Sequence, residues 1–174
     1  MDGVIADWNK QFCVISGLDH SEVIKNWKPG ITDISDQLGI SKSQMWGRIG
    51  ANKDFWMDIP VFPYAHEMVD YLRSKYEVRI CSSPSSDPLC VAHKLEWLNK
   101  NKFKFGKKTH INHEKWPLAG PGRLLIDDMD KNIEKWSNPP EPWAVAGPTL
   151  LFPQVWNSAG EYSGCKLQLI KDLL

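Results

Sequence analysis

Short apolar segments alternate with helical patterns through most of this sequence, and this alternation limits the fold more than any other feature. The apolar segments, which are β-branched or bounded by turn residues, are Val78–Cys81, Leu124–Ile126 and Thr149–Phe152, with Trp143–Ala146 as a weaker candidate. Helical patterns cover Ala65–Lys75, Pro88–Asn101, Asp130–Ser137 and Lys166–Leu174. Alternating strands and helices predict an α/β fold, with a Rossmann-like parallel sheet that helices cover on both faces.

The stretch from residue 12 to residue 62 has a different character. It is helix-rich, broken by loops and aromatic, and it precedes the first clear strand–helix repeat. A chain of 174 residues is long enough for one ordinary domain, or for a core with a small inserted cap. We therefore predict a core made of residues 1–11 and 63–174, with residues 12–62 as a small helical cap.

Composition narrows the class of partner. Lysine plus arginine and aspartate plus glutamate both number 21, so the formal net charge is zero. This balance gives no bulk attraction to a nucleic-acid polymer or a membrane surface, and we expect neither as a partner. The four cysteines are widely spaced and form no CxxC pair, which favours a reduced, cytoplasmic protein. The sequence leaves a homodimer open.

Polar residues follow two of the expected strands at the points where those strands end. Ser82 and Ser83 come after the first, and Asp127 and Asp128 come after the second, while Lys115 lies shortly before the acidic pair. Ligands of an open parallel sheet bind at the carboxyl ends of its strands. Each of these residues alone has an ordinary structural explanation, such as a solvated turn or a surface lysine. Together with Asp2-Gly3, their order along the chain favours one polar site.

The residue types suit phosphoryl transfer. A phosphate monoester is anionic and repels a carboxylate nucleophile, so a hard cation such as Mg²⁺, which prefers oxygen ligands, has to neutralise charge. An aspartate nucleophile forms an aspartyl-phosphate and divides one difficult step into two easier ones. A second aspartate acts as general acid and base, while a hydroxyl and a lysine hold the transferring oxygens.

Four motifs resemble those of the haloacid dehalogenase superfamily. They are Asp2-Gly3-Val4-Ile5-Ala6-Asp7, Ile80-Cys81-Ser82-Ser83-Pro84, Glu114-Lys115 and Leu124-Leu125-Ile126-Asp127-Asp128. They are most similar to the motifs of the 5′(3′)-deoxyribonucleotidase family, including its phage and bacterial members. The resemblance spans nearly the whole chain, and the first two motifs are more specific than the general superfamily pattern. It implies a magnesium-dependent phosphatase of nucleoside monophosphates.

The resemblance also implies roles for individual residues. Asp2 would be the acid/base and would give Mg²⁺ its backbone carbonyl, and Asp127, with Asp128 beside it, would bind the same ion. Ser82 would contact phosphate with its hydroxyl, and Lys115 would neutralise charge. The substrate-binding residues implied are Ser83 and Lys94 near the phosphate, and the aromatic residues Trp27, Phe55 and Trp56, which could stack on a base or pack in the core.

One part of the family pattern has no counterpart. The family's nucleophilic aspartate, and the first core strand before it, would fall immediately before Met1, so we expect an in-frame segment upstream of this residue. The alternatives are a nucleotide-binding pseudoenzyme and a phosphatase of another small phosphoester. Base and sugar preference, and the choice between 5′ and 3′ phosphate, remain open.

Overall fold

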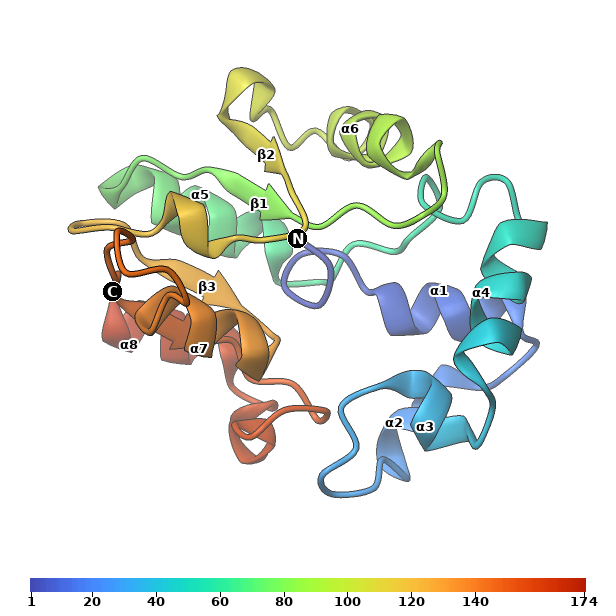
Figure 1. Ribbon diagram of the computed structural model, residues 1–174. Helices are drawn as coiled ribbons and strands as arrows, with labels where there is room; N and C mark the ends of the chain where they lie inside the picture. Colours follow the sequence, from blue (N-terminus) through green and yellow to red (C-terminus); the bar gives the residue numbers. More distant parts are fainter.

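The computed structural model describes residues 1–174 and has a mixed α/β architecture of eight α-helices and four short strands (Figure 1). The helices are α1 (Trp8–Ile15), α2 (His20–Lys25), α3 (Ile34–Leu38), α4 (Lys42–Ala51), α5 (Ala65–Lys75), α6 (Cys90–Lys100), α7 (Asp130–Ser137) and α8 (Lys166–Leu173). The strands are β1 (Ile80–Ser82), β2 (Thr109–Ile111), β3 (Leu125–Asp127) and β4 (Thr149–Leu151). No helix has both the length and the apolar character needed to cross a membrane.

The four strands form two separate parallel pairs rather than one continuous sheet. β1 pairs with β2 in the register Ile80 to Thr109, and β3 pairs with β4 in the register Leu125 to Thr149. The N-terminus lies close to the end of β1, on the side of this strand that faces β3 (Figure 1). The parallel pairing agrees with the predicted α/β class, while the predicted single sheet is here divided in two.

Amphipathic helices pack around the two strand pairs. α5 buries Ala65, Met68, Val69 and Leu72, a spacing that places the four side chains on one face of a helix. α7 packs against both β3 and β4, and α8 packs against α5. Helices α1 to α4 gather on the other side of the molecule, away from β3, α7 and α8 (Figure 1).

One apolar core connects these parts. A single cluster of 25 buried residues includes Phe12 and Ile49 from the predicted cap as well as Met68 and Trp97 from the predicted core. Trp97 is fully buried, and its indole Nε1 donates a hydrogen bond of 2.6 Å to the carbonyl of Ile59. The helical segment is thus packed onto the rest of the chain through a shared interior.

Several predicted elements are confirmed and others need correction. Helices α5 and α7 have the predicted bounds, whereas α6 begins at Cys90, two residues after the predicted start. The predicted strand Trp143–Ala146 is wrong: this segment forms no strand, and Trp143 is 69% exposed. Prolines on both sides of it disfavour sheet pairing because proline lacks an N–H donor. Strand β2 was not predicted.

Candidate functional site

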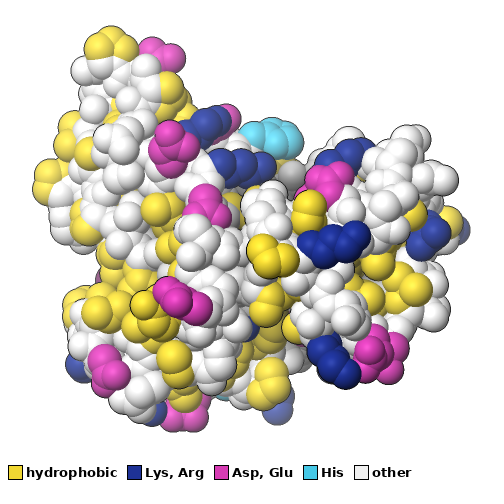
Figure 2. All heavy atoms as spheres, turned by 90° about the horizontal axis from the view of Figure 1, so that it is seen from below, with side chains coloured by type: hydrophobic (Ala, Val, Ile, Leu, Met, Phe, Trp, Pro, Cys, Tyr) yellow, Lys and Arg dark blue, Asp and Glu magenta, His cyan; other side chains and the backbone are white.

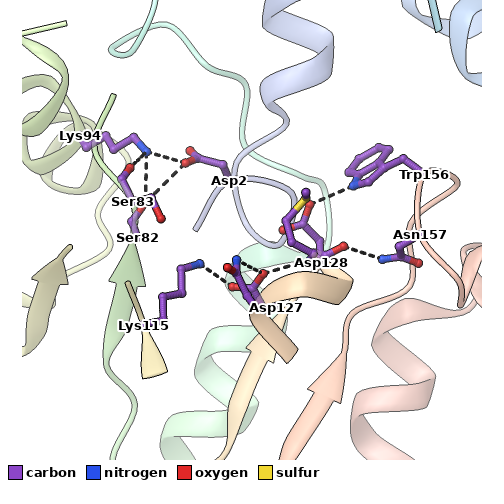
Figure 3. Close-up of polar contacts among 11 residues, drawn as sticks. Asp2, Ser82, Ser83, Lys94, Lys115, Asp127, Asp128, Trp156 and Asn157 are labelled. Carbon is purple, nitrogen blue, oxygen red and sulfur yellow. Dashed lines mark hydrogen bonds and ion pairs between the residues drawn. The ribbon is translucent and has the colours of Figure 1, made fainter. Parts of the chain in front are cut away.

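Polar side chains from distant parts of the chain meet where β1 and β3 end (Figure 3). β1 ends at Ser82, and β3 ends at Asp127. The loop of residues 1–6 brings Asp2 to the same place, and α6 contributes Lys94. The carboxyl ends of parallel strands are the expected place for such a cluster. The structure therefore brings together the predicted residues Asp2, Ser82, Ser83, Lys94, Lys115, Asp127 and Asp128.

Lys94 is the centre of the first half of the site. Its side chain is only 2% exposed, and its Nζ donates hydrogen bonds to Asp2 Oδ2 at 2.5 Å, Ser82 Oγ at 3.1 Å and the Ser83 carbonyl at 2.7 Å. Burial alone would raise the pKa of Asp2, but the ammonium of Lys94 and the amino group of Met1 outweigh it and lower that pKa. Asp2 is therefore held as a carboxylate beside a serine hydroxyl.

Lys115 and Asp127 form the second half. The Lys115 Nζ donates to Asp127 Oδ2, and both side chains are buried. Asp127 Oδ1 accepts from the backbone N–H of Met129 at 3.0 Å and from Asn132 Nδ2 at 2.8 Å. Burial tends to lower the pKa of Lys115, but the Asp127 carboxylate more than compensates, so the lysine pKa rises and its charge is retained.

Asp128 lies beside this ion pair without a cation of its own. Its Oδ2 accepts a hydrogen bond of 2.9 Å from Trp156 Nε1, and its backbone carbonyl accepts one of 2.8 Å from Asn157 Nδ2 (Figure 3). Burial, and then the negative charge of Asp127, raises the pKa of Asp128 to about 7. A second positive charge at this point would stabilise both carboxylates.

Gly3 allows the loop to approach Asp128 closely. Its φ is +72°, and a β-carbon at this position would lie 2.0 Å from Asp128 Oδ2. From the other side, Gln154 Nε2 donates to the Gly3 carbonyl, while Gln154 Oε1 accepts from Lys166 Nζ at 2.5 Å. The loop that carries Asp2 is thus held between β3 and the segment after β4.

The site opens into a cavity of about 440 Å³. Its lining includes Asp2, Ser82, Ser83, Lys94, Lys115 and Asp128, together with the aromatic side chains of Trp8, Trp46, Trp56 and Trp156. Lys131 and His113 add two further basic side chains to the lining. On the face of the molecule in Figure 2, basic and acidic side chains are interspersed.

The three aromatic residues predicted to bind substrate have different surroundings. Trp56 lines the cavity, where its ring centroid lies 5.0 Å from Lys94 Nζ. Phe55 is fully buried, and its ring packs 5.1 Å from that of Trp56, so it supports the cavity wall from behind. Trp27 packs 5.7 Å from Trp156 and does not line the cavity.

Sequence reasoning missed several residues that shape the site. Trp8 and Trp46 line the cavity, and Gln154, Trp156 and Asn157 fix the loop and Asp128. The segment after the last expected strand offered a signal for Gln154, Trp156 and Asn157, since residues that follow a parallel strand face the same edge as the acidic pair. Trp8 and Trp46 carried no comparable signal, because tryptophan occurs along much of the chain.

The carboxylates of the site are chemically suited to bind a hard cation, but their side chains are not grouped as a metal site in this structure. No group of three or more His, Cys, Asp or Glu side chains is arranged to hold a metal ion, and Asp2 and Asp127 are each paired with a lysine. However, Asp2 Oδ1 is buried and has no hydrogen-bond partner, although 28% of the side chain is exposed. An unpartnered carboxylate oxygen in a residue of the cavity lining is the donor type that Mg²⁺ prefers.

The arrangement as a whole suits the binding of an anionic group next to a flat apolar one. Two buried lysines and a serine hydroxyl provide donors, and tryptophans provide stacking surfaces. Three carboxylates nearby provide proton-transfer groups and hard oxygen ligands. No protein-family model matches this chain, and no curated protein matches it, so the functional argument depends on these residues and their geometry.

Proposed function

We propose that this protein is a magnesium-dependent phosphatase of ribo- or deoxyribonucleoside monophosphates, with a Rossmann-like core and a small helical cap. One observation carries the proposal. Lys94, Lys115, Ser82, Asp2 and Asp128 line one cavity of about 440 Å³ together with four tryptophans, and Asp127 is paired with Lys115 beside it. This pairing of an anion-binding floor with an aromatic wall suits a molecule that carries both a phosphate and a flat base.

The present ion pairs indicate how a phosphate would bind. Lys94 Nζ and Ser82 Oγ, which now contact Asp2, are donors of the kind that hold phosphoryl oxygens. A phosphate in contact with Lys94 would replace Asp2 as the partner of this lysine. With the lysine charge shared with the phosphate, the pKa of Asp2 would rise and its carboxylate could take up a proton from solvent. Asp2 would give this proton to the leaving oxygen as general acid, and would then accept a proton from the attacking water as base.

The nucleophile in this proposal is a carboxylate on the residue that precedes Met1. Met1 lies in the lining of the cavity with Asp2 and Lys115, so a residue joined to it would lie next to the same groups. Attack by that carboxylate on phosphorus would form an aspartyl-phosphate and release the nucleoside, and water would then release phosphate. Lys115 would offset the charge that develops on the transferring oxygens.

Mg²⁺ would be held by Asp2, Asp127 and Asp128. Asp2 would contribute its backbone carbonyl, so that its carboxylate stays available for proton transfer. The raised pKa of Asp128 supports this assignment, since it indicates a carboxylate whose charge is incompletely compensated. When bound, the ion would supply charge neutralisation for an anionic substrate. Binding of the ion can also be measured independently of enzymatic activity. Mg²⁺ should raise the midpoint temperature of thermal unfolding, and Asp127→Asn should abolish this increase.

The decisive experiment uses the chain with an N-terminal extension that ends in aspartate before Met1. This protein should release phosphate from a panel of nucleoside monophosphates only when Mg²⁺ is present, and Asp127→Asn should abolish turnover. Asp172→Asn, at an exposed acidic residue of α8, is the matched control and should leave turnover unchanged. Turnover that persists in EDTA, or in Asp127→Asn, would contradict the proposal.

The 174-residue chain itself provides the comparison with a nucleotide-binding pseudoenzyme. It contains the phosphate donors and the aromatic walls but has no carboxylate at the nucleophile position, so we expect it to bind nucleotides without hydrolysis. Equilibrium dialysis with a nucleoside monophosphate measures this binding directly. Magnesium-dependent turnover by this chain would show that the nucleophile has been assigned to the wrong position.

A further inference from the structure

Trp56 packs against Lys94 without competing for its hydrogen bonds. A lysine ammonium has three N–H donors. Their acceptors here are Asp2 Oδ2, Ser82 Oγ and the Ser83 carbonyl (Figure 3). The ring centroid of Trp56 lies 5.0 Å from the Lys94 Nζ, within the range of a cation–π contact. Both residues are buried, so this contact is desolvated and stronger than one at the surface.

Asp87 holds the ring of Trp56 in this position. The indole Nε1 donates a hydrogen bond of 2.8 Å to Asp87 Oδ2, a contact between residues 31 positions apart. The carboxylate is itself fixed on the loop after β1, since Asp87 Oδ1 accepts from the backbone N–H of Leu89 at 2.9 Å. The backbone N–H of Asp87 donates to Ser85 Oγ at 3.1 Å. A charged acceptor strengthens the hydrogen bond and polarises the group that donates it, so Asp87 both orients the indole and makes its ring face more negative.

The ring contact gains importance when an anion binds. In the proposed function a phosphate replaces Asp2 as the partner of Lys94, so the lysine loses the ion pair that now helps to fix it. The indole is uncharged, and an anion does not compete with it for the ammonium. Trp56 is also only 3% exposed, so little of its ring is open to stack on a base, whereas Trp46, also in the cavity lining, is 41% exposed.

We infer that Asp87 is a positioning residue for anion binding, and that it acts through the indole of Trp56 on Lys94. Asp87 is absent from the lining of the cavity, so its effect on a bound anion has to pass through another side chain. The inference rests on the part of the proposed function that assigns phosphate to Lys94. It goes further by placing Trp56 on the phosphate side of the site and not at the base.

Isothermal titration calorimetry of the 174-residue chain tests this inference, with inorganic phosphate and deoxyadenosine monophosphate as the two probes. Asp87→Ala should weaken the binding of both probes by about threefold to tenfold, because a desolvated cation–π contact loses its support. Asp87→Asn keeps an oxygen acceptor for the indole N–H, so its affinities should stay within about twofold of those of the wild-type protein.

A second substitution separates this role from a purely structural one. Trp56→Phe keeps an aromatic ring but removes the N–H that Asp87 accepts. In this background Asp87→Ala should cause no further loss of phosphate affinity, because the contact through which Asp87 acts is already absent. If Asp87 only supported the loop through Leu89, the loss would be the same in both backgrounds, and the inference would be overturned.

The matched control is Asp58→Ala. Asp58 pairs with Lys100 of α6 at 3.1 Å, so it also links the segment of Trp56 to the region of α6, but its side chain is 52% exposed and lies outside the cavity. Both affinities should be unchanged in this variant, and a loss equal to that of Asp87→Ala would overturn the inference.

Two further outcomes would also decide the question. A loss in Asp87→Ala confined to the nucleotide would overturn the inference, since Trp56 would then act on the base. Wild-type affinity for phosphate in Asp87→Ala would contradict this inference alone. Absence of phosphate and nucleotide binding by the unchanged chain would contradict the proposed function and this inference together.

Discussion

At the scale of single residues, Gly3 shows how closely the site is packed. We predict that Gly3→Ala destabilises the fold by about 3 kcal/mol, because the new methyl group would collide with the Asp128 carboxylate and the backbone would be strained at positive φ. The matched control is Gly17→Ala, where φ is +65° but nothing lies within 4 Å of the added carbon. Gly17→Ala should lower the free energy of unfolding by about 1 kcal/mol, because only the backbone strain of alanine at positive φ remains. Urea denaturation measures both, and equal losses would contradict the prediction.

Lys166 is a partly buried residue whose charged form is disfavoured in the folded protein. Burial lowers the pKa of its ammonium from 10.5 to about 8, so between these two pH values the unfolded chain binds more protons than the folded protein. The free energy of unfolding contributed by this group therefore rises as pH increases through that window. We predict that Lys166→Met removes this rise, as measured by urea denaturation from pH 7 to pH 10.5.

An exposed lysine provides the control for this pH dependence. Lys135→Met changes a side chain that is 48% exposed on α7. The free energy of unfolding of this variant should depend on pH in the same way as that of the wild-type protein. If Lys166→Met kept the wild-type slope above pH 8, the lysine would be solvated in solution and the assigned burial would be wrong.

At the scale of elements, α4 owes its start to a reciprocal cap. The Ser41 hydroxyl accepts from the backbone N–H of Gln44 at 3.1 Å, and the Gln44 side chain accepts from the backbone N–H of Ser41 at 2.8 Å. We predict that Ser41→Ala costs about 1 kcal/mol, because one of these two hydrogen bonds is lost. The control is Ser43→Ala at an exposed helical position, which should be neutral or slightly stabilising. Equal effects on the urea midpoint would contradict the capping argument.

The helices and strands differ in how well they could be predicted from the sequence. The helices α5 and α7 could be predicted to the residue because their apolar positions repeat at helical spacing and polar residues follow. Strand β2 could not, since Thr109, His110 and Ile111 are only partly buried and their pairing to β1 is a long-range contact. The Trp143–Ala146 segment has strand-like composition, yet its exposure and flanking prolines prevent pairing.

The candidate site was more predictable from sequence than the sheet that carries it. Ser82 and Asp127 each end a parallel strand, where ligand-binding residues are expected, and the structure unites them with Asp2, Lys94 and Lys115. Local sequence does not specify that Lys94 would be paired with Asp2, because that contact spans 92 positions. The burial of Phe55 behind Trp56 likewise depends on how the helical segment packs.

At the scale of the whole molecule, the helical segment and the α/β part should unfold together. The buried cluster of 25 residues includes Phe12 of α1 and Met68 of α5, so neither part retains a closed interior when the other opens. We predict coincident urea transitions for tryptophan fluorescence and far-ultraviolet circular dichroism, because a shared core makes unfolding one cooperative transition.

Two core substitutions, one in each part, make this prediction sharper. Phe12→Ala should cost about 3–5 kcal/mol and Met68→Ala about 2–5 kcal/mol, and each should reduce hydrogen-exchange protection in both α4 and α6 because the lost free energy is shared. Val14→Ala, at a side chain that is 61% exposed on α1, is the control and should change stability by less than about 0.5 kcal/mol. Loss of protection confined to α1–α4 in Phe12→Ala would mean that the helical segment opens by itself, as a separate cap would, and that the shared core does not couple the two parts.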